Sequence, residues 1–181
     1  MTPPARMETK RLVLRRPSMK DARAIFEEYA QDAEVTRYLR WPPQPGVDGV
    51  RAFLKHAAAM WREKSEFNWA ITRRHDDRTI GMIGARITMH GAELGYVLGR
   101  AHWGQGMMSE AAGAVTTWAL DEPTIHRVWA VCDVDNPASA RVMEKLGMER
   151  EGKLRAWSPH PNVSDVPRDC WCYARIKRPA R

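Results

Sequence analysis

The amino-acid sequence predicts a single domain of the mixed α/β or α+β class. The chain has 181 residues, 44% of them hydrophobic, which suits one globular domain with a substantial core. Segments with the apolar alternation of strands interleave with segments that have helical apolar spacing. No internal repeat or low-complexity tract divides the sequence, so we expect one domain over residues 1–181.

Four segments are predicted to be helices, because apolar residues recur on one face of each. Ser18, followed three residues later by Asp21, suits a helix start. We expect Asp48 to cap the second helix, and Asn136 to cap the fourth before a proline that fits the first turn. Gly147 suits the left-handed end of that last helix. The predicted helices cover residues 18–30, 48–61, 108–119 and 136–147.

Strands are predicted where apolar residues lie between turn signals. The segment 75–78 and the pair His90-Gly91 are typical of turns between neighbouring strands. The proline-rich segment 41–46 is expected to be a loop, because proline lacks an N–H donor and fixes φ. The predicted strands cover residues 12–14, 68–72, 80–89, 93–98, 126–132, 148–157 and 168–176.

The chain is basic, with 29 Lys and Arg against 22 Asp and Glu and a net charge of +7. Such a charge suits nucleic acid, an anionic small ligand or an acidic partner. The arginines are spread along the chain, and no DNA-reading helix or aromatic-basic surface pattern is recognisable. Nucleic acid is therefore not the preferred partner.

The three cysteines, Cys132, Cys170 and Cys172, cannot all pair within the chain, and their spacing is poor for zinc. We expect free thiols and no metal site. No run of about 18 apolar residues is present, so we expect no membrane span. The segment MTPPARMETKRL lacks the apolar stretch of a secretory signal, which favours a cytoplasmic location.

The stretch RAHWGQGMMSEAA, residues 100–112, places two glycines directly before a predicted helix. Backbone N–H groups in a helix's first turn lack partners and, with the helix dipole, stabilise an anion without any lysine. Gly104 and Gly106 would let phosphate oxygens approach closely. The string is neither a nucleotide-triphosphate loop nor a dinucleotide fingerprint, because it lacks Gly-Lys-Ser/Thr and has Ser at position 109. It predicts a phosphate or pyrophosphate site at residues 103–108, with a plain tight turn as the alternative.

Other strings stand in a fixed order around this loop. ELGYVL (93–98) precedes it, NPASARVMEKLGM (136–148) follows about thirty residues later, and TKRLVLRRPSMKDA (9–22) stands near the start. Together with WGQGMMSEA, they resemble the successive motifs of the GCN5-related N-acetyltransferases, in the branch that includes the ribosomal-protein N-terminal acetyltransferases. The resemblance covers about residues 8–176. It implies a central mixed, largely antiparallel twisted sheet of about seven strands, flanked by about four helices.

The resemblance implies acetyl-CoA as the cofactor, bound as the acyl donor, and no metal. Its pantetheine arm would run beside the preceding strand and bond backbone groups of Val97, Leu98 and Gly99. The pyrophosphate would sit on the loop and helix start. Asn136 and Ser139 stand where the family places side chains near the pantetheine and the sulfur. The implied donor-binding residues are Val97, Leu98, Gly99, Trp103, Gly104, Gln105, Gly106, Met107, Met108, Asn136 and Ser139.

Glu93 and Ser139 are the catalytic candidates. An α-amine with a pKa of ~7.7–8.0 is partly neutral at physiological pH, whereas a lysine amine near ~10.4 needs far more help from a base. Glu93 would act as that base through water, and a backbone N–H near Val97 would polarise the thioester carbonyl. Many relatives carry a tyrosine that protonates the departing thiolate. Here that position is Met143, so Ser139 or water would have to serve.

The acceptor amine is expected to enter opposite the donor. The family architecture places two connections there, residues 38–43 and 157–162. Both contain Trp and Pro, which suits an ordered apolar groove, although a need for rigid loops would also account for them. We therefore expect Tyr38, Trp41 and Trp157 to bind the acceptor.

These implications describe an acetyl-CoA-dependent N-acetyltransferase that acts on a primary amine. A peptide or protein N-terminal α-amine, or an amino-acid-like small amine, is the first choice of acceptor. Polyamines and antibiotic amines are alternatives with the same chemistry. A non-catalytic CoA-binding sensor, suggested by Met143, and a basic nucleic-acid-binding module are alternatives of other classes. A homodimer is compatible with the sequence, and no membrane contact is expected.

Overall fold

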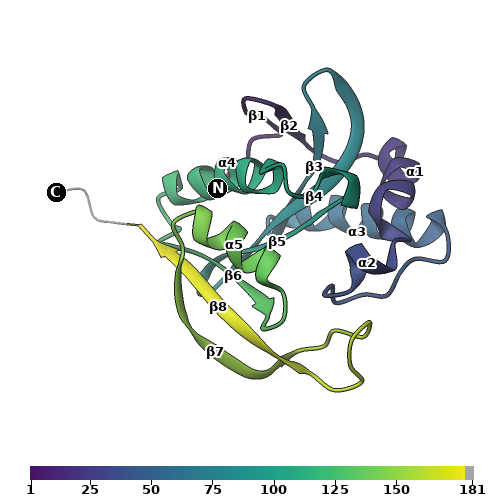
Figure 1. The fold of residues 1–181 in the computed structure, drawn as a ribbon. Coiled ribbons are helices and arrows are strands. Elements are labelled where there is room, and N and C mark those ends of the chain that lie inside the picture. Colours follow the sequence, from purple (N-terminus) through teal and green to yellow (C-terminus); the bar gives the residue numbers. More distant parts are fainter. Residues whose placement is uncertain (178–181) are drawn as a thin grey trace.

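The fold is an eight-stranded sheet with helices on both faces, as a computed structural model of residues 1–177 describes it (Figure 1). The strand order is β1-β2-β3-β4-β5-β6-β8-β7. The short strand β1, which sequence patterning did not predict, pairs with β2 at the sheet edge. The strands are β1 (Arg6–Glu8), β2 (Leu12–Arg15), β3 (Glu66–Arg73), β4 (Asp76–Thr88), β5 (Gly91–Leu98), β6 (Arg127–Asp133), β7 (Glu149–Ser158) and β8 (Arg168–Ile176).

The helices follow the predicted order with three differences, the first being the short helix Ala33–Thr36, which the sequence did not predict. The α-helices are α1 (Ala22–Ile25), α2 (Ala33–Thr36), α3 (Val47–Glu63), α4 (Met107–Asp121) and α5 (Pro137–Lys145). The single helix expected over residues 18–30 is a 3₁₀ turn, α1 and a π-helical turn in succession. The expectation that Asp48 caps the second helix was wrong. Gly46 takes the extended N-cap conformation, so α3 begins at Val47 and Asp48 lies in its first turn.

The two faces of the sheet bury different apolar clusters. Successive residues of a strand point to opposite faces, and on β4 Ile83 belongs to one cluster and Met82 to the other. α4 packs on the Ile83 face, and Figure 1 shows α5 beside it. On the Met82 face, Ile25 of α1 and Leu54 of α3 complete the second cluster. The sheet is therefore the middle layer of the domain.

The junction of β5 and β6 is the one place where the ladder is short. Every other neighbouring pair in the sheet is antiparallel, but β5 and β6 are parallel and share only the pairs Ala92–Val128 and Glu93–Trp129. Beyond Glu93 the two strands separate. The sheet thus has two leaves, β1 to β5 and β6 to β8, joined at one end and open at the other.

Three expectations about composition can be compared with the structure. Cys132, Cys170 and Cys172 are buried free thiols, as predicted. Within residues 1–177, no group of three or more His, Cys, Asp or Glu side chains is placed to hold a metal ion. None of the helices in this range combines the length and apolarity that crossing a membrane would require.

Candidate active site

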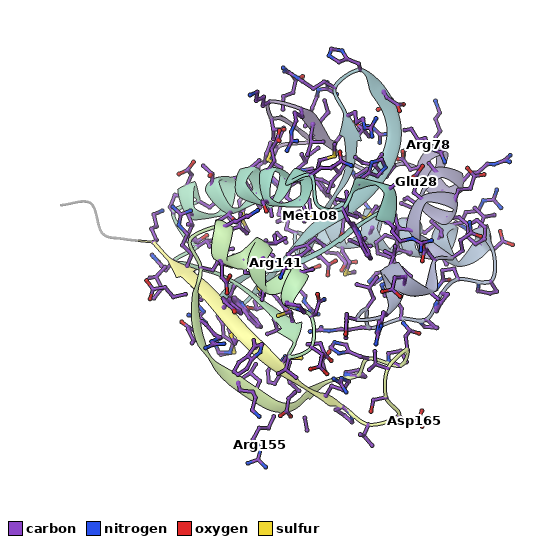
Figure 2. All side chains as sticks on the ribbon, in the orientation of Figure 1. Glu28, Arg78, Met108, Arg141, Arg155 and Asp165 are labelled. Atoms are coloured by element: carbon purple, nitrogen blue, oxygen red, sulfur yellow. The ribbon has the colours of Figure 1, made fainter. Side chains whose placement is uncertain are left out.

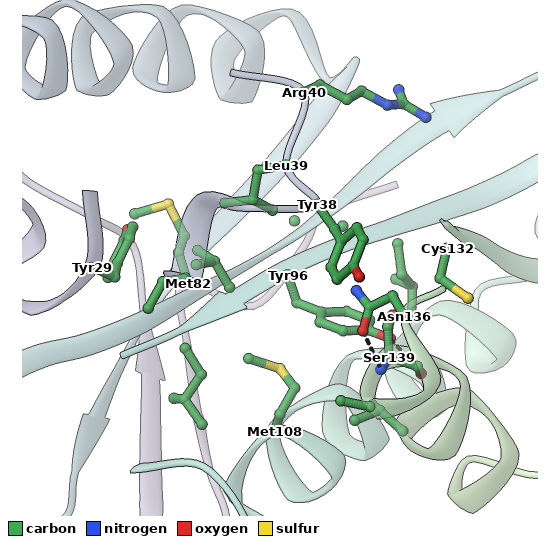
Figure 3. Close-up of a pocket in the computed structure, with 18 of the residues that line it drawn as sticks. Tyr29, Tyr38, Leu39, Arg40, Met82, Tyr96, Met108, Cys132, Asn136 and Ser139 are labelled. Atoms are coloured by element: carbon green, nitrogen blue, oxygen red, sulfur yellow. Dashed lines mark hydrogen bonds between the residues drawn. The ribbon is translucent and has the colours of Figure 1, made fainter. Parts of the chain in front are cut away.

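A cavity of about 1030 Å³ opens where β5 and β6 separate. It is lined by the connection between α2 and α3, by β4, β5 and β6, and by the starts of α4 and α5. Figure 3 shows that Tyr38, Tyr96, Asn136 and Ser139 meet on one side of it, although they come from three different parts of the chain. The parting of two strands therefore brings distant residues together around a single space.

At one end of the cavity the backbone forms an anion seat, which we define as residues 104–108. Gly104 and Gly106 have φ of 72° and 71°, a left-handed conformation that favours glycine. The first hydrogen bond of α4 runs from the Glu110 N–H to the Gly106 carbonyl at 3.1 Å, so the preceding N–H groups of the helix have no helical partner. These free donors at the start of a 15-residue helix fit a pyrophosphate.

The turn between β1 and β2 holds this seat in place. Glu110 of α4 accepts hydrogen bonds from the Thr9 hydroxyl at 2.6 Å and from the Arg11 backbone N–H at 2.8 Å. The Arg11 guanidinium donates to the Gln105 carbonyl at 2.9 Å. Its Nη2 atom would lie 3.7 Å from a Cβ placed on Gly106. The Arg11 guanidinium, which also pairs with Glu110 at 2.6 Å, therefore lies beside the seat. Sequence reasoning missed it because nothing local relates position 11 to position 105.

Most of the predicted donor-binding residues line the cavity, and two do not. Gln105 bonds its side chain to the Ala101 carbonyl at 3.0 Å. Gly99 is packed closely against the carbonyls of Glu28 and Ile80. These two shape the loop rather than the cavity wall. The residues that do line the cavity are Val97, Leu98, Trp103, Gly104, Gly106, Met107, Met108, Asn136 and Ser139.

Charge on the wall near the seat is positive. Arg141 and Lys145, both on α5, line the cavity. Figure 2 shows Arg141 on α5 and Met108 on neighbouring α4, whereas Arg155 and Asp165 lie at the outer edge of the molecule near β7 and its following loop. The acidic Asp165 is exposed and is not part of the cavity wall.

Asn136 and Ser139 form the start of α5. The Asn136 side-chain oxygen accepts from the Ser139 N–H at 3.1 Å, and Pro137 follows in the first turn, which confirms the predicted cap. The Ser139 hydroxyl lies 2.9 Å from the phenol oxygen of Tyr96 on β5. Met143, one turn further along the helix, is fully buried in the core and presents no proton donor.

Tyr96 is a residue that sequence reasoning did not single out, although it lies within the quoted ELGYVL string. Burial raises the pKa of Tyr96 above its ordinary value, so its phenol stays protonated and can donate a hydrogen bond. Tyr96 lies two residues from both Leu94 and Leu98, so the three side chains share one face of β5, and that face is buried. The sequence signal that could have identified Tyr96 is a phenol among apolar residues on one strand face.

On the acceptor side, Tyr38 and Trp41 line the cavity as expected. Trp157 does not line it: this side chain is 47% exposed and lies outside the cavity wall, so its predicted contact with the acceptor stays a prediction. The reason for this exposure is a register shift in β7 between residues 154 and 158, where Ala156 has a φ of 45°. This irregularity changes the direction in which the following side chains point.

The loop between β7 and β8, residues 159–167, is tied across the cavity mouth. The Asn162 side-chain amide donates to the carbonyls of Thr36 at 2.7 Å and Trp41 at 2.9 Å. The Arg40 guanidinium donates to the Ser158 hydroxyl at 3.0 Å. The two connections predicted to face the acceptor are thus in direct contact, and the residue of this loop that lines the cavity is His160.

Glu93 lies where the two leaves part. Its carboxylate pairs with the Arg86 guanidinium at 2.8 Å and with that of Arg40 at 3.5 Å, and its side chain is mostly buried. Glu93 lines the cavity, as its predicted role requires. Two cations nevertheless share this carboxylate, a contact pattern that the sequence did not reveal.

A second buried carboxylate, Asp133, lies at the end of β6. It accepts from the Arg168 Nε at 2.6 Å, from the Asp135 N–H at 2.9 Å and from the His160 Nδ1 at 2.7 Å. Burial alone would raise the pKa of Asp133, but the hydrogen bonds from Arg168, Asp135 and His160 outweigh it and hold this pKa below its ordinary value. Asp133 is therefore an anion that only accepts hydrogen bonds.

Comparison with known proteins agrees with this geometry. The family model described as acetyltransferase (GNAT) domain matches residues 11–149. The chain is similar to the uncharacterized N-acetyltransferase YoaA of Bacillus subtilis (strain 168), with 36% identity over 94% of this chain and 96% of that protein. It is also similar to the [ribosomal protein uS5]-alanine N-acetyltransferase of Escherichia coli (strain K12), with 28% identity over 83% of this chain and 81% of that enzyme.

A solved structure supports the same assignment. The crystal structure of the acetyltransferase (GNAT family) from Bacillus anthracis superposes with a TM-score of 0.82 at 28% identity, covering 95% of this chain and 98% of that one. The fold class expected from the sequence is confirmed. The chain belongs to the GNAT acetyltransferase family, and it is an acetyl-transfer enzyme whose acetyl donor is acetyl-CoA.

Proposed function

We propose that this enzyme acetylates the primary amine of a peptide-like or amino-acid-like acceptor, with an N-terminal α-amine as the first choice. The observation that carries the proposal is the continuity of the cavity. One space of about 1030 Å³ reaches from the anion seat to Tyr38, Trp41 and His160. A donor at the seat and an acceptor at the tied loops would therefore meet between the two leaves.

The proposed donor position uses the open edge of β5. Past Glu93 this strand has no partner in β6. The Gly99 N–H bonds the Ile80 carbonyl, so the backbone groups of Val97, two residues earlier, also face β4. The Leu98 carbonyl accepts from the Trp103 indole at 2.7 Å, which leaves the Leu98 N–H and the backbone groups of Tyr96 for the amide-containing arm of acetyl-CoA. The pyrophosphate then occupies the anion seat. Arg141 and Lys145 of the cavity wall supply positive charge around a strongly anionic ligand, and Arg11, paired with Glu110, lies beside the seat.

The proposed leaving-group proton comes from the pair Tyr96 and Ser139. Their oxygens lie 2.9 Å apart, both residues line the cavity, and the phenol is protonated. Ser139 passes a proton to the departing thiolate and receives one from Tyr96, and the Tyr96 phenolate regains its proton from solvent water once the products leave. The demand on this pair is modest, because a thiol with a pKa of about 8.5 leaves readily. In this proposal a residue of β5 takes part in the proton donation that Met143 cannot provide.

An α-amine acceptor suits the charges on the acceptor side. A polyamine calls for several carboxylates without cationic partners, but Glu93 and Asp133 are bound to arginines, which leaves Glu34 and Glu66 of the cavity wall. The E. coli relative is named as an alanine N-acetyltransferase of a ribosomal protein, which is consistent with an N-terminal amine. We place the enzyme in the cytoplasm, and a homodimer stays a prediction.

Isotope-labelled acetyl-CoA and mass spectrometry test this proposal. The panel contains peptides with free or blocked N-termini, free amino acids, lysine with a blocked α-amine, spermidine and an aminoglycoside. We expect labelling of the free α-amines and none of the blocked peptides.

Other outcomes identify the alternatives. Preferential labelling of spermidine or the aminoglycoside would replace the acceptor class. Calorimetric binding of CoA without labelling of any amine or extract component would favour a sensor. Salt-dependent DNA binding in the absence of CoA binding would favour a nucleic-acid module.

A further inference from the structure

The buried pair His160 and Asp133 has the geometry of a general base and the group that orients it. The His160 Nδ1 lies 2.7 Å from an oxygen of Asp133, whose side chain is completely buried. His160 itself is only 4% exposed. Both residues line the cavity, at the end of β6 and in the loop that follows β7. No sequence motif pointed to either residue.

The hydrogen bonds around Asp133 determine which nitrogen of His160 carries the proton. Asp133 is ionised and can only accept, because Arg168 and the Asp135 N–H already donate to it. The His160 Nδ1 must therefore be the donor. In the neutral imidazole the other nitrogen, Nε2, then carries the lone pair.

That lone pair is open to the cavity. Within residues 1–177, Nε2 of His160 has no hydrogen-bond partner, and it is not among the fully enclosed polar side-chain atoms that lack one. Since His160 belongs to the cavity wall, Nε2 is the part of this buried ring that the cavity can reach. An acceptor nitrogen entering beside Tyr38 and Trp41 would approach it directly.

Glu93, the base expected from the sequence, is placed less favourably for this role. Its carboxylate is held between Arg86 and Arg40, and taking up a proton would leave both guanidiniums without their anion. His160 gains a proton next to an anion that is already bound to it, so the imidazolium that forms is stabilised by Asp133.

We propose that His160 is the general base of the acetyl transfer and that Asp133 positions it. This proposal rests on acetylation of an amine but not on the class of that amine. As the amine nitrogen forms a bond to the thioester carbonyl carbon, its proton passes to Nε2 of His160. The carbon–sulfur bond then breaks, and the CoA thiolate takes up a proton from the Ser139 side of the cavity.

The charged groups around the ring favour this step. Asp133 on β6 faces Nδ1, and Arg168 of β8 neutralises part of that charge while also binding Asp135. From the connection between α2 and α3, Arg40 binds Ser158 and Glu93. Arg86 of β4 also binds Glu93, so Asp133 is the carboxylate in direct contact with the ring and the one placed to stabilise an imidazolium.

The test compares pH profiles of kcat/KM, using whichever amine of the panel is acetylated. Three variants are measured: His160→Gln, Glu93→Gln and, as a control histidine on the surface, His126→Gln. We expect His160→Gln to lower kcat/KM about 10²- to 10⁴-fold and to remove the ionisation on the acidic limb. The acetyl-CoA Kd should be unchanged, and His126→Gln should match the wild type.

Because His160 is buried, a substitution that only disturbs folding would also lower activity. A second variant separates these two causes. His160→Ala leaves space for an added base, and imidazole in the buffer should restore at least a tenth of the wild-type rate in a concentration-dependent way. Loss of the acidic limb in Glu93→Gln, with that limb retained in the His160 variants, would overturn the proposal in favour of Glu93. Absence of imidazole rescue in a folded His160→Ala protein that binds acetyl-CoA would overturn it as well. If no amine is acetylated at all, the acceptor assignment fails before this comparison begins.

Discussion

The phenol oxygen of Tyr96 lies 2.9 Å from the hydroxyl oxygen of Ser139, a residue 43 positions further along the chain. Tyr96 also donates to the Ser139 carbonyl at 3.2 Å. β5 and α5 are held together by this pair at the cavity wall, next to Asn136 (Figure 3). The pair joins the proposed donor strand to the helix whose start would contact the sulfur.

Tyr96→Phe tests the proposed proton path. We expect kcat to fall about 10- to 100-fold with acetyl-CoA, because Ser139, which protonates the thiolate, loses the group that resupplies its proton. The loss should shrink with an acetyl thioester of a more acidic thiol, which leaves without a proton. Tyr173→Phe is the control, since the Tyr173 phenol bonds Glu144 outside the cavity wall. An equal loss with both thioesters would assign Tyr96 a packing role only.

Gly106→Ala tests the anion seat. Gly106 has a φ of 71°, a conformation that costs a residue with a Cβ about 1–2 kcal/mol. Relaxation of this strain turns the free N–H groups away from the ligand, so we expect the acetyl-CoA Kd to rise about 10-fold. Calorimetric titration measures the change. Gly152→Ala, on β7 with open space around it, should leave the Kd unaltered. Tight binding by Gly106→Ala would place the pyrophosphate elsewhere.

Asn162→Ala tests whether the tied loops form the acceptor side. The substitution removes two hydrogen bonds, to Thr36 and Trp41, each contributing about 1 kcal/mol. We expect KM for the amine to rise about 10-fold while KM for acetyl-CoA stays constant. Steady-state kinetics with each substrate varied in turn separates the two. Asp165→Asn, an exposed change in the same loop, should be neutral. A rise confined to acetyl-CoA would contradict the placement.

Asp21→Asn tests a structural ion pair with a defined pH dependence. Burial alone would raise the pKa of Asp21, but hydrogen bonds from Arg15, Ser18 and Thr79 lower it below its ordinary value of 3.8. The stabilising contribution is therefore complete above about pH 4 and is lost as the pH falls through the folded-state pKa. We expect Asp21→Asn to lower the free energy of unfolding by about 3 kcal/mol at pH 7.

Urea denaturation at several pH values checks this prediction. The difference between Asp21→Asn and wild type should narrow as the pH drops towards 3. Asp48→Asn is the matched control, because the Asp48 carboxylate is 91% exposed and its pair with Arg51 should contribute less than about 1 kcal/mol. A difference that does not depend on pH would remove the ionised carboxylate from the explanation.

Local patterns predicted the parts of the fold that local chemistry determines. Asn136 and Pro137 define the start of α5, and Gly104 and Gly106 mark the seat before α4, because caps and left-handed turns require particular residues. The π-helical turn over Phe26–Ala30 has the same apolar spacing as an α-helix, so periodicity could not reveal it. The irregularity at Ala156, which turns Trp157 outward, has no sequence signature either.

The contacts that define the candidate site were less predictable. Arg11 meets Gln105, Tyr96 meets Ser139 and His160 meets Asp133 only because strand register and loop path bring them together. A motif can place each of these residues on an element, but distances between elements depend on the packing of the whole sheet. Glu93 shows the same limit, since its two arginine partners come from β4 and from the connection after α2.

The two residue pairs that join β5 to β6 have a consequence for the ligand-free protein. Amides on the open half of β5 that face the separated strand have no ladder partner on that side, so they should exchange with deuterium rapidly until acetyl-CoA binds. At this junction a single short parallel ladder resists rotation of the two leaves of the sheet relative to each other. In the proposed complex the pantetheine arm fills the gap between the two leaves, so donor binding should raise the resistance of the domain to proteolysis along with its melting temperature.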